Sequence, residues 1–398
     1  MSEQPEVRGA GPEEFDRVVT CIATAFGSEQ DDWPRVHAWR DPNHRPELHR
    51  VCVVDGEVVS ALRVVVQDVR YNRAALKHYG IADVGTPPPH RERGYSTRCL
   101  QDAIAFMEAE GAHFSTLYTG IQPFYARLGW ATLPLQAPTF TLPDSVRMPE
   151  GIEVLPLSRE AHLDGVRAVY EALNVAKTAT TIRDDRYWQL RFARDDARWR
   201  VAIMDGEVAA YICTQTHDET LRVLEYGWSR GRSRALAAVF ADAMGRGTEA
   251  GAQRMVCQFG DDDMGQEVVG RLASPAPPIT WEHLMFRIID LRGLLEAIEP
   301  VLRERAHRAR ELPEGAAINL IWDRLAASLR YDIELVTIGG PLPGRPTLEL
   351  SSADLVQLIF GVGGRQLAPV RQLPYKERRL LEVMFPGEHF VFWETDAF

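Results

Sequence analysis

The sequence contains no long apolar run. No apolar stretch reaches the roughly 20 residues that a membrane-spanning helix needs. The polar segment from Met1 to Pro12 also lacks the apolar core that secretory signals carry. We therefore expect a cytoplasmic protein without a membrane partner.

Cysteine is scarce, with only five among 398 residues. An odd number of widely spaced cysteines excludes a disulfide-rich scaffold, and none has the short Cys/His spacing of a zinc site. We expect no metal site, and reduced thiols at Cys21, Cys52, Cys99, Cys213 and Cys257.

An excess of basic residues is absent as well. The chain has 45 Lys and Arg against 56 Asp and Glu, which gives a formal net charge of −11. Nucleic-acid binding needs a basic surface, so we expect no nucleic-acid partner. An acidic protein attracts cationic substrates, but the same charge also serves plain solubility.

What is present is a chain long enough for two or three domains with the ordinary composition of a globular protein. Its periodicity predicts a helix at 14–26, a hairpin across Asp55-Gly56, a strand from Gly80 to Val84 and a helix at 96–111. A strand at 113–118, a short helix at 123–128 and a strand at 130–135 follow. This order predicts a mixed α/β sheet flanked by helices.

The turn between the strand at 80–84 and the helix at 96–111 carries Arg91-x-x-Gly94-x-Ser96. Amide groups at a helix N-terminus, with a glycine that permits close approach, form an anion site. This pattern resembles the acetyl-CoA pyrophosphate loop of the GNAT acetyltransferases, with Ser96 where Gly or Ala is usual. The resemblance implies cofactor contacts at Val84, Gly85, Thr86, Arg91, Glu92, Arg93, Gly94, Tyr95, Ser96 and Thr97.

The hairpin at 50–58 recurs at 200–208, an offset of 150 residues (200 − 50). The second copy has 228–234 where the pyrophosphate turn would lie, and that segment lacks the Arg-x-x-Gly pattern. Proline-rich stretches at 134–156 and 274–278 separate the parts. We expect a catalytic GNAT domain at 1–140, a degenerate second GNAT domain at 150–285 and a sterol-carrier-protein-like α+β domain at 286–398.

The third part shows a helix at 291–309 and strands at 317–322, 331–338 and 348–350, followed by a helix from Leu355 that Ser351 caps. With this part included, the whole chain resembles the Eis-type acetyltransferases. The motifs that carry this resemblance are the turn at 90–94, Phe124-Tyr125-Ala-Arg-Leu-Gly-Trp130 and the final residues 395–398. The resemblance implies acetyl-CoA as donor, a primary amine of a cationic, aminoglycoside-like small molecule as acceptor, and a homohexamer.

Acetyl transfer from a thioester needs a proton for the departing thiolate, and a tyrosine phenol can supply it. Tyr125 matches the family's general acid, and the backbone at 83–85 would hold the thioester oxygen. The resemblance assigns the general base to the terminal carboxylate of Phe398. Asp83, on the strand where many GNAT enzymes carry a base, is the competing assignment.

Further residues could line an amine pocket. Phe26 and Trp33 would supply apolar walls, and the acidic candidates are Glu29, Asp31, Asp32, Asp83, Glu394 and Asp396. Two other functions stay open: a lysine acetyltransferase acting on proteins or peptides, and a non-catalytic lipid- or ligand-binding scaffold whose GNAT site is vestigial.

Overall fold

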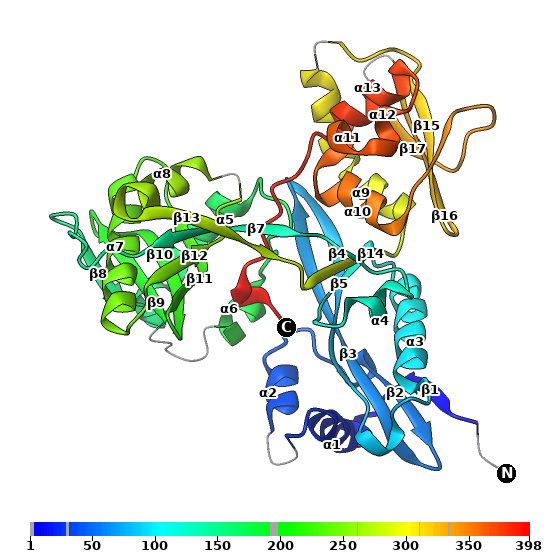
Figure 1. Ribbon diagram of the computed structural model, residues 1–398, viewed down its shortest axis with the longest axis horizontal. Helices are drawn as coiled ribbons and strands as arrows, with labels where there is room; N and C mark the ends of the chain where they lie inside the picture. The colour runs from blue at the N-terminus through cyan, green and yellow to red at the C-terminus, as the bar shows by residue number, and fades with distance from the viewer. Residues whose placement is uncertain (1–3, 29–31, 192–197, 261, 310, 333–334) are drawn as a thin grey trace.

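The computed structural model describes residues 4–28, 32–191, 198–260, 262–309, 311–332 and 335–398. Three domains surround a central point at which the C-terminal segment ends (Figure 1). Two of them contain a mixed seven-stranded sheet, and the third contains a four-stranded sheet. The predicted α/β fold class is confirmed.

The first sheet has the order β1-β2-β3-β4-β5-β14-β6, with β4 and β5 as its parallel pair. Its helices are α1 (Phe15–Ala25), α2 (Trp33–Trp39), α3 (Tyr95–Ala109) and α4 (Gln122–Ala126). Alternate residues of β2 face opposite layers: Val51 packs with α1 and Cys52 with α3. Its strands are β1 (Glu6–Gly9), β2 (His49–Val54), β3 (Glu57–Tyr71), β4 (Ala74–Gly85), β5 (Phe114–Tyr118), β14 (Leu284–Ile288) and β6 (Ala131–Thr132).

The second sheet repeats this plan in the order β13-β7-β12-β11-β10-β9-β8, with β11 and β12 parallel. Its Asp205-Gly206 turn has φ values of 55° and 80°, close to the 51° and 80° of Asp55-Gly56. The two hairpins therefore share one turn geometry. The elements are β7 (Leu135–Thr141), β8 (Glu153–Pro156), β9 (Trp199–Met204), β10 (Glu207–His217), β11 (Thr220–Trp228), β12 (Arg254–Cys257), β13 (Ser274–Trp281), α5 (Arg159–Asn174), α6 (Asp185–Arg191), α7 (Ser233–Glu249) and α8 (Asp263–Leu272).

The two sheets exchange strands, which the sequence did not predict. β14, from beyond the second domain, lies between β5 and β6, whereas β7, which follows the first domain, lies between β12 and β13. The stretch at 134–156, predicted as a linker, thus contains two strands of the second sheet. The prolines at 275, 277 and 278 lie in β13, an edge strand, where missing N–H groups cost no ladder bond.

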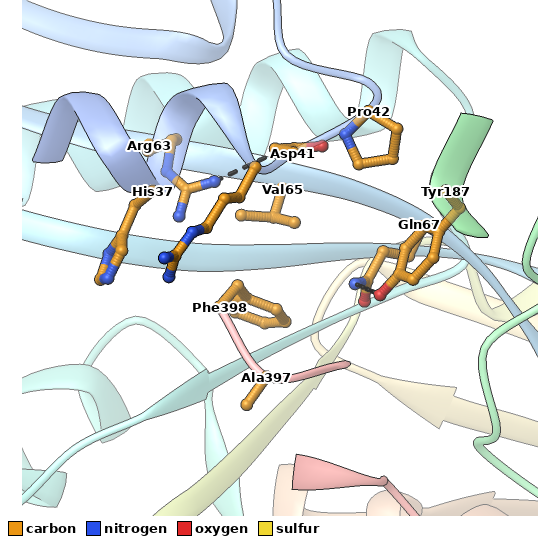
Figure 2. Close-up of a pocket in the computed structure, with 10 residues that line it drawn as sticks. His37, Asp41, Pro42, Arg63, Val65, Gln67, Tyr187, Ala397 and Phe398 are labelled. Carbon is orange, nitrogen blue, oxygen red and sulfur yellow. Dashed lines mark hydrogen bonds and ion pairs between the residues drawn. The ribbon is translucent and has the colours of Figure 1, made fainter. Parts of the chain in front are cut away.

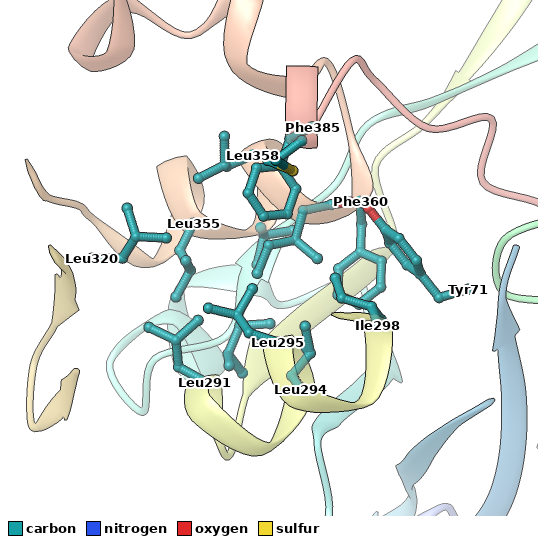
Figure 3. Packing of buried hydrophobic residues seen from close by; sticks show 14 of the residues in the cluster. Tyr71, Leu291, Leu294, Leu295, Ile298, Leu320, Leu355, Leu358, Phe360 and Phe385 are labelled. Carbon is teal, nitrogen blue, oxygen red and sulfur yellow. Dashed lines mark hydrogen bonds between the residues drawn. The ribbon is translucent and has the colours of Figure 1, made fainter. Parts of the chain in front are cut away.

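The third domain shares a core with the first. Val69, Tyr71 and Leu76, at the far end of the β3–β4 hairpin, pack among α9 and α10, and Tyr71 Oη donates a hydrogen bond to Ile359 O at 3.1 Å (Figure 3). The stretch at 331–338, predicted as one strand, holds the end of β16 and most of β17. The elements are α9 (Leu291–Arg308), β15 (Ala317–Trp322), β16 (Leu325–Asp332), β17 (Leu335–Gly339), β18 (Thr347–Glu349), α10 (Ser352–Phe360), α11 (Gly363–Gln366), α12 (Ala368–Arg371) and α13 (Tyr375–Met384).

Among the described residues, none forms a helix with the length and apolar character needed to cross a bilayer.

Candidate active site

The first domain opens where β4 and β5 part. Their parallel pairing runs from His78 opposite Phe114 to Ile81 opposite Leu117, whereas β4 continues to Gly85. Beyond Ile81, the edge of β4 that faced β5 is therefore unpaired. An extended ligand could therefore bind along this segment of the backbone.

A β-bulge re-aims the backbone at this opening. The β3–β4 register shifts between Ala61, opposite Gly85, and Arg63, opposite Ala82. Asp83 lies within the shift and has a φ of 56°, a left-handed conformation that is uncommon for a residue with a side chain. Bulges of this kind are frequent beside active sites, where they direct backbone groups toward a ligand.

The predicted anion-binding turn follows β4 directly. Gly94 has a φ of 77° and caps α3, and no side chain hydrogen-bonds the first amide groups of that helix. Arg93 is exposed and forms no ion pair or hydrogen bond within the described chain. This turn therefore presents free amide donors and a free guanidinium to solvent, as an anionic ligand requires.

Arg91 occupies a different position from Arg93. Its Nε donates to Thr86 O at 3.1 Å, and its Nη2 donates to Ala25 O at 2.8 Å. These bonds tie the turn to the end of α1. Arg91 thus shapes the turn with its side chain, while Arg93 stays available.

Tyr125 lies on α4, immediately after β5, and is 7% exposed. Its ring packs edge-on against Phe124 and Trp130 at centroid distances of 4.9 and 6.4 Å. Burial raises the pKa of the phenol to about 12. The phenol has no hydrogen-bond partner in the described part of the chain, so at neutral pH it keeps a proton that is not committed elsewhere.

Contacts from beyond the first domain fix the loop after Tyr125. Ser352 Oγ donates to Gly129 O at 2.6 Å, and the Arg287 guanidinium lies 5.6 Å from the Trp130 ring and 5.2 Å from the Trp322 ring. The third domain and the exchanged strand β14 together support the segment that carries Tyr125.

A cavity of about 230 Å³ lies on the first domain where the C-terminal segment meets it (Figure 2). Phe398 enters this cavity beneath Arg63 and Val65. A Cβ built at Gly80 would lie 2.0 Å from Phe398 Cζ, so the glycine provides room for the ring. The lining consists of His37, Arg40, Asp41, Pro42, Arg63, Val65, Gln67, Tyr187, Ala397 and Phe398.

Asp83 is committed to neighbouring side chains. Arg63 Nε donates to Asp83 Oδ2 at 2.8 Å, and His37 Nδ1 lies 3.6 Å from Asp83 Oδ1. Burial acts to raise the pKa of Asp83, but the hydrogen bond from His37 and the charge of Arg63 outweigh it and lower that pKa. A buried carboxylate that has a lowered pKa and an arginine partner is a poor proton acceptor.

The predicted acidic candidates of the C-terminal segment do not line the cavity. Asp396 is fully buried, and Arg183 and Tyr187 bind it. Glu394 pairs with Arg222; burial raises its pKa while Arg222 acts to lower it. Both carboxylates anchor the segment.

The residues predicted between the first two helices lie beside the cavity. Phe26, which is 56% exposed, packs edge-on against Trp33 at 5.4 Å. Trp33 in turn lies 5.0 Å from His37, which lines the cavity. Asp32 pairs with Arg35 at 2.8 Å, and Glu29 and Asp31 fall outside the described residues.

Arg63 and Gln67 were not predicted as site residues, although the sequence contains a signal for them. Together with Val65 they occupy every second position of β3 and therefore share one face, on which two polar side chains stand among apolar ones. Gln67 is 3% exposed, and its Oε1 has no partner in the described chain. Tyr187 comes from the second domain, and no local pattern could have placed it here.

The sequence of residues 6–133 matches the family of acetyltransferase (GNAT) domains. The N-terminal domain is a GNAT domain. The match confirms the predicted enzyme class, an N-acetyltransferase, and GNAT domains use acetyl-CoA as their acyl donor. No curated protein matches the sequence.

Solved structures share the fold over almost the whole chain. A GCN5-related N-acetyltransferase from Anabaena variabilis is 17% identical, with a TM-score of 0.72, over 97% of this chain and 98% of that one. One from Kribbella flavida is 18% identical, with a TM-score of 0.72, over 99% and 98%. Eis1 from Mycobacterium abscessus is 16% identical, with a TM-score of 0.65, over 98% and 99%. These structures therefore share the fold of this chain over nearly its whole length.

Proposed function

We propose that this chain is an acetyl-CoA-dependent N-acetyltransferase that acetylates a primary amine of a small molecule. The observation that carries the proposal is the combination, in one GNAT domain, of an uncapped helix N-terminus at Gly94 and a buried, protonated Tyr125. Acetyl-CoA would supply the activated acetyl group.

The chain's own residues divide the remaining work. Arg93, Gly94 and the amides that follow would bind the pyrophosphate, and the bulge at Asp83 would direct backbone N–H groups at the thioester oxygen. Tyr125 holds a proton at its phenol oxygen and would donate it to the departing thiolate. Its raised pKa keeps that proton in place at neutral pH.

We assign the general base to the terminal carboxylate of Phe398, because Phe398 lines the cavity and Asp83 is committed to Arg63. The buried Gln67 Oε1, which lacks a partner in the described chain, would accept a hydrogen bond from the incoming amine. His37 lines the same cavity and is the comparison residue for the base assignment.

The aminoglycoside-like acceptor belongs to the same proposal. Asp41, Asp83 and Asp396 each pair with a buried arginine, so the carboxylate of Phe398 would be the main attraction for a cationic amine. An acceptor panel should therefore include aminoglycosides, simple monoamines and lysine peptides. We also propose, from the sequence resemblance, that the chain is an Eis-type acetyltransferase and that it forms a hexamer.

The test is release of the free thiol from acetyl-CoA across this panel. With any active acceptor, we expect Tyr125→Phe to lower kcat on the order of 10²-fold, because the thiolate then leaves without its proton. The Kd for acetyl-CoA should stay within about twofold. Unchanged turnover would exclude Tyr125 as the acid.

The base is tested by adding one residue after Phe398, with His37→Gln as the comparison. The extension should lower kcat at least about 10²-fold, and more than His37→Gln does. An absence of thiol release with every amine, together with no thermal shift on adding acetyl-CoA, would favour the non-catalytic scaffold.

A further inference from the structure

The C-terminal segment carries a fully buried carboxylate, Asp396, that is bound by an arginine of the second domain. Arg183 Nη2 donates to Asp396 Oδ2 at 2.8 Å and to Glu225 Oε2 at 2.6 Å. The exposed fractions are 6% for Arg183 and 0% for Glu225 and Asp396. A single buried guanidinium therefore joins strand β11 to the third residue from the end of the sequence.

Other contacts fix the same segment from both sides. Tyr187 Oη donates to Asp396 Oδ1 at 2.7 Å, and Gln67 Nε2 donates to Asp396 O at 3.2 Å. Trp393, which is 1% exposed, donates from Nε1 to Asn174 Oδ1 at 3.0 Å. Both the backbone and the side chain of Asp396 are thus held, by the first and second domains respectively.

Burying these charged groups costs desolvation free energy. Burial acts to lower the pKa of Arg183, but the charges of Asp396 and Glu225 outweigh it and raise that pKa. Buried ion pairs are often no more stabilising than apolar residues of similar volume, whereas they do fix one geometry. What this network fixes is the path of the segment from 393 to 398.

The last residue of the segment, Phe398, packs against the first domain. The Phe398 ring lies over Gly80 of β4, and its centroid is 5.8 Å from that of His78. Figure 2 shows Phe398 beneath Arg63, with Ala397 leading to it. The second domain therefore holds the segment at Asp396, and the ring of Phe398 packs against the first domain.

We infer that Arg183 and Asp396 are positioning residues that hold Phe398 in the cavity of the first domain. On this inference the second domain, which lacks the pyrophosphate turn, holds a catalytic group in place. An effect of this positioning on turnover rests on the proposed function, because it requires Phe398 to supply the base. The positioning of Phe398 by Arg183 and Asp396 does not depend on that function.

The test uses the full chain ending at Phe398 and two matched variants. Asp396→Asn removes the charge that Arg183 holds. Asp262→Asn removes another buried carboxylate of the second domain, one that accepts hydrogen bonds from Tyr226 at 2.8 Å and Trp228 at 3.0 Å and has no hydrogen bond to residues 394–398. Both variants disturb the same domain, but only the first removes bonds to residues 394–398.

Two readouts separate positioning from general destabilisation. Release of Phe398 by a carboxypeptidase selective for aromatic ends, followed by mass spectrometry, should be about tenfold faster for Asp396→Asn. Its kcat should fall on the order of 10²-fold, since small displacements of a reacting group have that effect. The KM for acetyl-CoA should stay within about twofold, and Asp262→Asn should change none of these values.

Equal release rates for Asp396→Asn and the unmodified chain would overturn the inference, as would equally fast release from Asp262→Asn. If Asp396→Asn fails to fold, Tyr187→Phe, which removes one bond to Asp396 and keeps the ion pair, should give a smaller acceleration. Full turnover of the chain extended after Phe398 would overturn the proposed base alone, because the release rate requires no catalysis.

Discussion

The two sheet domains share a plan and differ at the point where their parallel strands part. In the first, pairing ends at Ile81 and β4 continues to Gly85; in the second, pairing ends at Val223 and β11 continues to Trp228. Tyr226 and Trp228 both donate to Asp262, which follows β12, and thereby bridge the two strands. No hydrogen bond bridges Ala82–Gly85 to residues 119–126 in the described chain.

The turns after these strands differ in the same way. Arg93 is free of protein partners in the described chain, whereas Arg232 pairs with Asp205 and Arg234 donates to Glu150 O at 2.7 Å. Two of the three arginines at 228–234, Arg232 and Arg234, are thus bound to the protein itself. Trp393 of the C-terminal segment also packs on Tyr226, at 5.5 Å. The comparison shows that one scaffold can leave its opening free for a ligand or fill it with its own chain.

The largest expected effect concerns the carboxylates of the central strands. Asp83 is paired with buried Arg63, as Glu225 is with buried Arg183, and we interpret both as structural. Asp83→Asn should lower the free energy of unfolding by about 3 kcal/mol at neutral pH, because it leaves a buried arginine short of a partner. Its kcat per folded molecule should fall less than that of Tyr125→Phe. Urea denaturation and thiol release measure the two effects.

The pH dependence sharpens this prediction. Since the folded pKa of Asp83 lies below its unfolded value of about 3.9, its stabilising contribution is present above that pH and is lost as pH falls through the folded pKa. The stability gap between the unmodified chain and Asp83→Asn should therefore close in acid. A gap that does not narrow as the pH falls below the unfolded pKa of about 3.9 would contradict the interpretation. A loss of kcat as large as that expected for a general base would restore Asp83 as the base.

The features of the two domains that depend on residues close together in the sequence could be predicted. The features that depend on contacts between distant segments could not. The Asp55-Gly56 and Asp205-Gly206 turns, the helix start at Gly94 and the Ser351 cap depend on residues close together in the chain, and the structure has all of them. The exchange of β7 and β14 depends on contacts between distant segments, so proline-rich stretches suggested linkers instead. For the same reason Tyr187 and Arg183 were missed: their partners lie about 210 residues away.

The second-largest expected effect concerns the glycines that precede α3 and α7. Gly94 and Gly231 precede α3 and α7 with φ values of 77° and 82°, and a Cβ at either would meet no protein atom within 4 Å. Gly94→Ala and Gly231→Ala should therefore cost a similar stability, about 1 kcal/mol, from the left-handed conformation. Only Gly94→Ala should also raise the Kd for acetyl-CoA, about tenfold, because its Cβ obstructs close approach of the pyrophosphate.

Isothermal titration with acetyl-CoA measures this difference, and thermal unfolding serves as the control for equal strain. An equal rise in Kd for both variants would show that strain alone weakens binding. It would then remove the turn at Gly94 as the distinguishing feature of the first domain.

The smallest effect separates the two arginines of the first turn. Arg93→Ala should raise the Kd for acetyl-CoA only about threefold, since an exposed charge contributes less than about 1 kcal/mol. That rise should shrink at high salt, where exposed charges are screened. Arg91→Ala removes bonds to Thr86 O and Ala25 O, so its rise in Kd should persist at high salt and accompany a lower midpoint of thermal unfolding. A salt-independent effect at Arg93 would mean that this arginine, like Arg232 in the second turn, binds the protein and not the ligand.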